Sequence, residues 1–145
     1  MNTATADVPL LEILRNKVIE FRQGLPGIPA SREFVMTQEP EERPFAWLQS
    51  VNEPHVRFAV VAAYAWDRDF TLEIDDEVLE ELGSLDPFDY AVYFILHIQQ
   101  RDGRTTLKAK PNAPLVVNVR NREARQVPLP SSTETQKAEA LCLQL

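Results

Sequence analysis

Carboxylates are the side chains of this sequence whose number and spacing come closest to a chemical site. Between residues 73 and 89 there is no Lys or Arg, and eight acidic residues occur: Glu73, Asp75, Asp76, Glu77, Glu80, Glu81, Asp86 and Asp89. Paired carboxylates can act as general acid and general base, but the acid needs a buried environment that raises its pKa. The local pattern places most of these residues on an exposed helical face, so we expect no acid–base catalysis from them.

The other reactive side chains are few and widely spaced. His55 and His97 are the only histidines, and neither has a Cys, His or carboxylate at the spacing of a metal site. Cys142, the single cysteine, cannot form an internal disulfide and lies in a polar C-terminal segment. The sequence has no Gly-x-Ser-x-Gly motif, and its four glycines form no phosphate-binding loop. We therefore expect a protein that is not an enzyme and that uses neither metal nor cofactor.

Length and net charge narrow the class of protein. The chain has 145 residues, about the size of one domain, and a formal net charge of -7. Proteins that neutralise nucleic-acid phosphates normally carry clustered Lys and Arg, so the acidic balance argues against direct nucleic-acid binding. The first residues lack the features of a signal peptide, and no run approaches the roughly twenty apolar residues of a membrane span. We expect a cytoplasmic protein.

The charge changes sign along the chain. After the acidic residues of 73–89, the segment 101–125 has two acidic residues, Asp102 and Glu123, against seven basic ones: Arg101, Arg104, Lys108, Lys110, Arg120, Arg122 and Arg125. Two interpretations of the acidic residues stay open. They form a solvated face, or they dock a basic protein partner.

A short helix is expected to carry many of the carboxylates. In the segment 75–83 the apolar residues Val78, Leu79 and Leu82 fall on one helical face, and the acidic first turn complements the positive end of the helix. Gly83 is suited to end it. The preceding segment, 69–74, alternates apolar and polar residues, which predicts a strand with one exposed face.

Strands are expected on both sides of this helix. The segment 44–61 predicts a core hairpin, because two arms rich in aromatic and β-branched residues flank a turn at Asn52–His55. Other expected strands are one or two within 10–21, and single strands over 34–36, 105–108, 113–118 and 124–129. GLPGIP (24–29) predicts a rigid turn, and the Asp102-Gly103 pair predicts another.

The segment 91–98 is the most apolar stretch and has two possible roles. Val92, Phe94, Leu96 and Ile98 share one face, and Tyr93, Ile95 and His97 share the other. Such a strand is either covered on both sides or presents an apolar face to a partner. Tyr93, Ile95 and His97 are therefore candidate partner-binding residues.

These elements predict a mainly β fold: a small antiparallel barrel-like or roll domain with one short acidic helix. We expect a flexible N-terminal lead-in over 1–9, the β domain over 10–129 and a C-terminal tail over 130–145. The end of the tail, 138–145, is expected to form a helical turn or two if it docks.

The order of several motifs resembles FliW, the bacterial flagellar assembly factor. The motifs are GLPGIP (24–29), EFVM (33–36), PFAWLQSV (44–51), FAVV (58–61), LEELG (79–83), APLVVN (113–118) and RQVPL (125–129), and the resemblance spans about residues 10–129. It implies a small cytoplasmic, mainly β protein that binds flagellin. When flagellin is exported, such a protein binds the RNA-binding repressor CsrA away from its RNA-binding surface and relieves repression of flagellin synthesis. LKAKPNAPL (107–115) departs from the family's pattern, which leaves the partner surface near 105–113 undefined.

The resemblance and the charge pattern together predict a protein-binding surface on a monomer. Its expected residues are Glu73, Asp75, Asp76, Glu77, Glu80, Glu81, Tyr93, Ile95 and His97. A flagellin chaperone without CsrA antagonism is one alternative. A small-ligand-binding β-barrel is another, and a core filled by Trp47, Phe58 and Phe94 would argue against it.

Overall fold

The structure, a computed structural model, describes residues 2–4, 17–25, 28, 30–129 and 142–144. Its strands are β1 (Asn2–Ala4), β2 (Val18–Phe21), β3 (Glu33–Thr37), β4 (Phe45–Ser50), β5 (Arg57–Ala62), β6 (Leu72–Ile74), β7 (Tyr90–Arg101), β8 (Arg104–Ala109), β9 (Leu115–Asn118), β10 (Glu123–Gln126) and β11 (Cys142–Gln144). Its helices are the α-helices α2 (Ala63–Trp66) and α3 (Asp76–Leu82) and the 3-10 helices η1 (Pro40–Glu42) and η2 (Pro87–Asp89).

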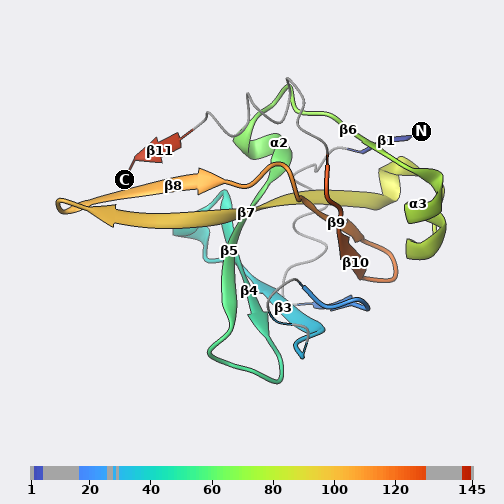
Figure 1. Ribbon diagram of the computed structural model, residues 1–145, viewed down its shortest axis with the longest axis horizontal. Helices are drawn as coiled ribbons and strands as arrows, with labels where there is room; N and C mark the ends of the chain where they lie inside the picture. Colours follow the sequence, from blue (N-terminus) through green and yellow to red (C-terminus); the bar gives the residue numbers. More distant parts are fainter. Residues whose placement is uncertain (1, 5–16, 26–27, 29, 130–141, 145) are drawn as a thin grey trace.

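One nine-stranded sheet, in the order β11-β8-β7-β5-β4-β3-β2-β10-β9, makes up most of the fold (Figure 1). Because β9 also pairs with β7, the strands from β7 round to β9 close on themselves and leave β8 and β11 outside the ring. Every pairing is antiparallel except that of β10 with β2. The predicted mainly β, rolled fold is confirmed, with α2 as a second short α-helix beside the expected α3.

The predicted hairpin over 44–61 is confirmed as β4 and β5, which pair with Leu48 opposite Phe58. The alternation of the strand turns Ala46, Leu48 and Ser50 into the core. Trp47 lies half-buried on the outer face, where the Arg57 guanidinium carbon sits 4.2 Å from its ring centroid. A cation over an aromatic face is attracted by the ring quadrupole, so this pair shields the outer side of the hairpin.

Aromatic side chains pack on both faces of the sheet, with Phe21 and Phe34 turned into the ring and Phe94 turned to the other face. Phe21 and Phe34 meet edge to face with ring centroids 5.6 Å apart, and Phe70 meets Phe94 in the same way at 4.9 Å. Phe94 is fully buried as expected, whereas Phe58 is only half-buried at the margin of the core, as Trp47 is. Full burial of each large apolar side chain stabilises the fold by about 1.5–3 kcal/mol, so the ring has a core of its own.

Strand β7 is longer than the predicted strand over 91–98 and changes environment along its length. Tyr90 to Phe94 are buried on both faces, whereas His97 is exposed and Ile98 is 43% exposed. Beyond them β7 and β8 form a hairpin that extends from the body of the molecule (Figure 1). Its turn is the predicted Asp102-Gly103 pair, in which both residues have positive φ, 52° and 74°.

The two ends of the chain differ from expectation where they are described. Residues 2–4, expected within a flexible lead-in, form β1 and pair with β6. The helical turn predicted near the C-terminus is wrong for residues 142–144, which form β11 and pair with the edge of β8. Within 10–21 only the second predicted strand is described, as β2; residues 10–16 and 130–141 lie outside the described residues.

Candidate protein-binding surface

Helix α3 presents the acidic residues in the way its sequence predicts. Leu79 and Leu82 are buried and Val78 is half-buried, so the apolar face fixes the helix to the sheet. The helix ends at Gly83, whose φ of 99° is left-handed and whose N–H donates to the carbonyls of Leu79 and Glu80. The opposite face, with its carboxylates, is left toward solvent.

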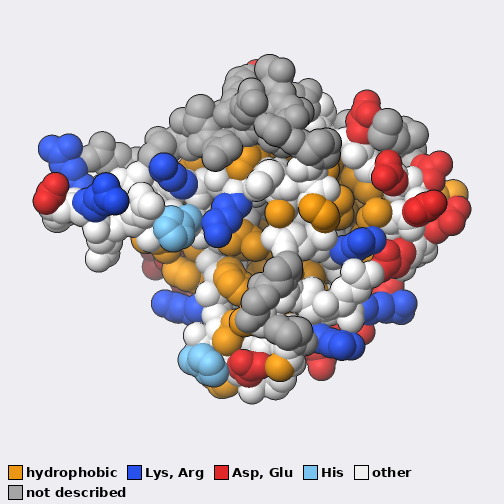
Figure 2. Space-filling model, in the orientation of Figure 1, with side chains coloured by type: hydrophobic (Ala, Val, Ile, Leu, Met, Phe, Trp, Pro, Cys, Tyr) orange, Lys and Arg blue, Asp and Glu red, His pale blue; other side chains and the backbone are white. Residues whose placement is uncertain are grey.

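Six of the eight carboxylates of segment 73–89 are exposed, and we call them the acidic surface: Glu73, Asp75, Asp76, Glu77, Glu80 and Asp86. They lie on β6, at the N-cap of α3, on α3 itself and just before η2. Figure 2 shows acidic side chains gathered at the end of the molecule where Figure 1 places α3, while Lys and Arg occupy the opposite end at the β7–β8 hairpin. Other Lys and Arg side chains lie beside the acidic ones in Figure 2, so the two charged segments of the sequence are only partly separated in space.

Glu81, which the prediction groups with the other carboxylates, is less exposed than these six and is paired within the chain. It is half-buried, and Arg125 Nη1 donates to its Oε2 at 2.7 Å while Gln23 Nε2 donates to its Oε1 at 2.6 Å. Both carboxylate oxygens are therefore engaged within the chain. Through these contacts Glu81 joins α3 to β10 and to the turn after β2.

Asp89 is also turned inward, although it belongs to the same acidic segment. Its Oδ2 accepts from Ser84 Oγ and its Oδ1 accepts from Arg120 Nε, each at 2.6 Å. These contacts, the Ser84 hydrogen bond first and the Arg120 guanidinium second, hold the pKa of Asp89 below its ordinary value despite the opposing effect of burial. Arg120 and Arg125 of the basic segment thus neutralise two of the eight carboxylates.

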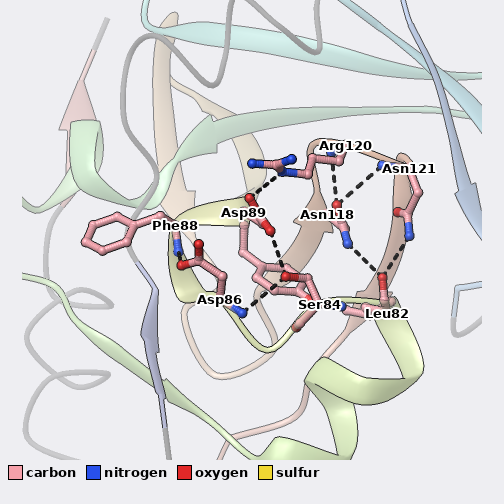
Figure 3. A network of polar contacts seen from close by, with 9 residues as sticks. Leu82, Ser84, Asp86, Phe88, Asp89, Asn118, Arg120 and Asn121 are labelled. Carbon is pink, nitrogen blue, oxygen red and sulfur yellow. Dashed lines mark hydrogen bonds and ion pairs between the residues drawn. The ribbon is translucent and has the colours of Figure 1, made fainter.

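Two asparagines, Asn118 at the end of β9 and Asn121 in the β9–β10 turn, hold the end of α3 (Figure 3). Asn118 Nδ2 and Asn121 Nδ2 donate to the Leu82 carbonyl at 2.8 and 2.9 Å. Asn118 Oδ1 in turn accepts from the backbone N–H of Arg120 at 2.9 Å. The last carbonyls of a helix have no partner within it, so these side chains supply what the helix lacks. The acidic surface therefore stands on a fixed support.

Tyr90 also fixes the end of α3, through its hydroxyl. Its hydroxyl oxygen lies 2.6 Å from the Ser84 carbonyl and 3.0 Å from the Leu79 carbonyl, which share its single proton, and it accepts from the Ser84 N–H at 3.2 Å. Burial is the main cause of the raised pKa of this phenol. One side chain of β7 thereby ties α3 to the segment that leads into η2.

The second predicted set, Tyr93, Ile95 and His97, is divided by the structure. Tyr93 is 1% exposed and Ile95 is half-buried, because the neighbouring strands of the ring cover this part of β7. His97 alone is exposed. Tyr93 cannot present its ring to a partner in this conformation. Burial raises the pKa of its hydroxyl, which has no hydrogen-bond partner among the described residues.

Two exposed apolar residues beside the acidic surface were not predicted. Leu85 is 54% exposed and Phe88 is 85% exposed, in a segment whose sequence, SLDPFDY (84–90), indicates only a turn. The sequence gives only a weak indication that Phe88 is exposed. It is an aromatic residue between Pro87 and Asp89, with a second carboxylate at Asp86. The exposure of Phe88 could be recognised only after the hydrogen-bond partners of Asp86 and Asp89 were known.

Within the described residues, no group of three or more His, Cys, Asp or Glu side chains could hold a metal ion. The exposed His55 and His97 lie on different elements, the β4–β5 turn and β7. No helix in the described ranges is long and apolar enough to cross a membrane. The feature of the described surface that offers specific chemistry is the acidic surface with its two apolar neighbours.

Comparison with known proteins points to one family. The model of the family described as FliW protein matches residues 2–140. The flagellar assembly factor FliW of Geobacillus kaustophilus (strain HTA426) is 35% identical over 117 residues, which cover 81% of this chain and 79% of that protein. The flagellar assembly factor FliW of Geobacillus sp. (strain WCH70) is 34% identical over 127 residues, covering 88% and 86%.

The fold agrees with the sequence comparison. A solved structure described as the crystal structure of the flagellar assembly factor FliW matches with a TM-score of 0.70 and 34% sequence identity, over 81% of each chain. Both comparisons extend over most of the β domain that carries the acidic surface. This chain therefore belongs to the FliW family of flagellar assembly factors.

Proposed function

We propose that this chain is a non-enzymatic flagellar assembly factor that binds the translational repressor CsrA and flagellin in the cytoplasm. In this role, binding to CsrA relieves repression of flagellin synthesis, and flagellin competes for the same factor. The observation that carries the proposal, beyond membership of the family, is the acidic surface at one end of the molecule. CsrA is a basic RNA-binding protein, so this surface is its expected docking site.

Complementary charge explains how such a contact would form. Exposed carboxylates attract a basic partner over about a Debye length, roughly 8–10 Å at physiological salt, which raises the association rate and selects partners. Asp76, Glu77 and Glu80 of this surface lie on α3, whose end is fixed by Asn118 and Asn121. A surface that is already ordered loses less conformational entropy on binding.

The interior of the ring argues against the ligand-binding alternative. A small-ligand barrel needs an open apolar pocket with a few convergent polar groups. Here Phe21, Phe34 and Tyr93 are buried on the face of the sheet that turns into the ring, where Phe21 and Phe34 pack edge to face. Side chains therefore occupy the space that a ligand would need.

The proposal is tested by titrating purified CsrA and purified flagellin separately into the protein, and then by titrating CsrA into the preformed flagellin complex. We expect both to bind and flagellin to weaken the apparent affinity for CsrA. Binding of flagellin alone would favour a chaperone without CsrA antagonism. Binding of neither partner by the folded protein would contradict the proposal.

A further inference from the structure

Phe88 is the most exposed of the large hydrophobic side chains that the structure describes. It is 85% exposed, compared with 54% for Leu85 and 51% for Val51. Scattered exposed aliphatic residues are common on protein surfaces. An almost fully exposed phenylalanine is less common, and here a second exposed apolar residue, Leu85, lies three positions before it. Apolar surface rimmed by polar residues is typical of interaction sites.

The backbone at Phe88 is held by a chain of hydrogen bonds. Asp86 Oδ1 accepts from the Phe88 N–H at 2.9 Å and caps η2, whose first position is Pro87. Ser84 Oγ accepts from the Asp86 N–H at 3.1 Å. Because Pro87 has a fixed φ and Asp86 satisfies the donor of Phe88, the ring is presented on a short, ordered element.

The same chain of contacts continues into the core. Ser84 Oγ donates to Asp89, which is paired with Arg120, and the Tyr90 hydroxyl bonds the backbone of Ser84. Figure 3 shows the Phe88 ring pointing away from this network while its backbone belongs to it.

The charges of the chain segment that carries Phe88 indicate what kind of surface it fits. Asp86, two residues before it, is exposed, and the exposed carboxylates Glu77 and Glu80 lie on α3, which ends just before Ser84. An apolar pocket rimmed by acidic groups would repel this surface. A pocket rimmed by Lys and Arg would bury the ring and pair the carboxylates at once.

We propose that Phe88 is the apolar anchor of the acidic surface and inserts into an apolar pocket rimmed by Lys and Arg on the basic protein partner. The inference rests on the proposed function, with CsrA as that partner. The carboxylates would steer the encounter, while the buried ring would slow dissociation. Leu85 would contribute apolar contact at the margin.

The test is the affinity of Phe88→Ala for purified CsrA, with Val51→Ala as the matched control. Val51 is also an exposed apolar residue, but it lies in the β4–β5 connection. We expect Phe88→Ala to weaken binding by about tenfold or more, mainly through faster dissociation, and Val51→Ala to leave it unchanged. Both variants should keep the melting temperature of the parent, since neither side chain is in the core.

Salt separates the anchor from the charges. The loss caused by Phe88→Ala should be similar at about 0.05 M and about 0.5 M salt, because burial of a ring is not screened. The loss caused by reversing Glu77 and Glu80 to lysine should shrink over the same range. A Phe88→Ala effect that disappears with added salt would overturn the apolar anchor.

Variants of Asp86 test whether its hydrogen bond to the Phe88 N–H contributes to CsrA binding. Asp86→Asn removes the charge and keeps an oxygen that can accept from the Phe88 N–H, whereas Asp86→Ala removes both. At high salt we expect Asp86→Ala to bind more weakly than Asp86→Asn. We also expect the effect of Phe88→Ala to be smaller in the Asp86→Ala background, because the two residues act through one contact. Equal and additive effects would show that Asp86 does not position the ring.

The binding measurements distinguish an error in the Phe88 proposal from an error in the proposed function. If the parent protein binds CsrA and Phe88→Ala binds equally well, the anchor is wrong and the docking proposal stands. If the folded parent protein does not bind CsrA at all, the docking proposal is wrong and the anchor falls with it.

Discussion

Arg120 Nε donates to Asp89 Oδ1 at 2.6 Å, across a sequence separation of 31 residues. The bond joins η2, at the end of the acidic segment, to the turn between β9 and β10 in the basic segment. Arg120 is largely exposed and Asp89 is buried, so the guanidinium covers a carboxylate that would otherwise be buried without a counter-charge. The contact orders the segment that carries Phe88.

Replacing Asp89 with Asn should destabilise the protein by about 1–3 kcal/mol at neutral pH, because hydrogen bonds to a charged group are lost. The pKa of Asp89 is below its ordinary value of 3.8 in the folded state. A lowered folded pKa stabilises the fold above the unfolded value, and this stability is lost as the pH falls through the folded value. The difference between parent and variant should therefore be constant near neutrality and shrink below about pH 4.

Urea unfolding at about pH 7 and about pH 3 measures that difference in the free energy of unfolding. Asp86→Asn is the matched control, since it changes the same chemistry on an exposed residue of the same segment. An equal difference at both pH values would show that the charge of Asp89 does not stabilise the fold.

Tyr93 and Tyr90 make a pair of opposite predictions. Both are buried tyrosines of β7, but the hydroxyl of Tyr90 bonds the carbonyls of Leu79 and Ser84, while that of Tyr93 has no partner among the described residues. Removing an unpaired buried polar group relieves its desolvation penalty. Tyr93→Phe should leave the free energy of unfolding unchanged or raise it by about 1 kcal/mol, and Tyr90→Phe should lower it by about 1–2 kcal/mol.

Thermal and urea unfolding of the two variants provide the comparison. A clear loss of stability in Tyr93→Phe would mean that this hydroxyl is satisfied in solution. Equal effects of the two substitutions would contradict the difference in hydrogen bonding.

Gly83 should tolerate substitution less well than Gly103. Both have positive φ, 99° and 74°, so alanine is strained at either position by about 1–2 kcal/mol. A Cβ at Gly83 would also lie 2.7 Å from Asn121 Nδ2, whereas one at Gly103 meets nothing within 4 Å. Moving Asn121 away would break its hydrogen bond to Leu82, which should add about 1 kcal/mol to the loss.

The free energies of unfolding of Gly83→Ala and Gly103→Ala, measured in urea, test this difference. The excess loss in Gly83→Ala should disappear in an Asn121→Ala background, where the clash and the bond are both absent. An excess that persists there would place its cause elsewhere.

The sequence predicted the elements whose patterns are local. The hairpin over 44–61 and the helix over 75–83 follow from alternation, helical spacing and a terminating glycine, and the Asp102-Gly103 turn follows from its residue types. The length of β7 could not be predicted, because its outer half, with the exposed His97 and Ile98, is held by pairing with β8 rather than by its own burial.

The acidic surface was predicted only in part, since charge along a sequence does not show which way a side chain turns. Glu81 and Asp89 resemble their neighbours in sequence, but residues 44 and 31 positions away pair with them. The hydrogen bonds that hold the backbone at Phe88 were not predicted for the same reason. These hydrogen bonds include one from Arg120 in the β9–β10 turn. That turn reaches η2 only because β9 pairs with β7 and closes the ring.

The central claim is that the acidic surface docks CsrA, and the most direct measurement is CsrA binding by a double variant, Glu77→Lys with Glu80→Lys. Glu81 is left in place because it is paired with Arg125. The control is Glu41→Lys with Glu42→Lys, which makes the same change of net charge on the exposed η1. We expect the affinity of the α3 variant to fall by roughly tenfold or more at low salt, with a smaller fall at high salt, and that of the η1 variant to change little. Equal affinities for the parent and a folded α3 variant would contradict the claim.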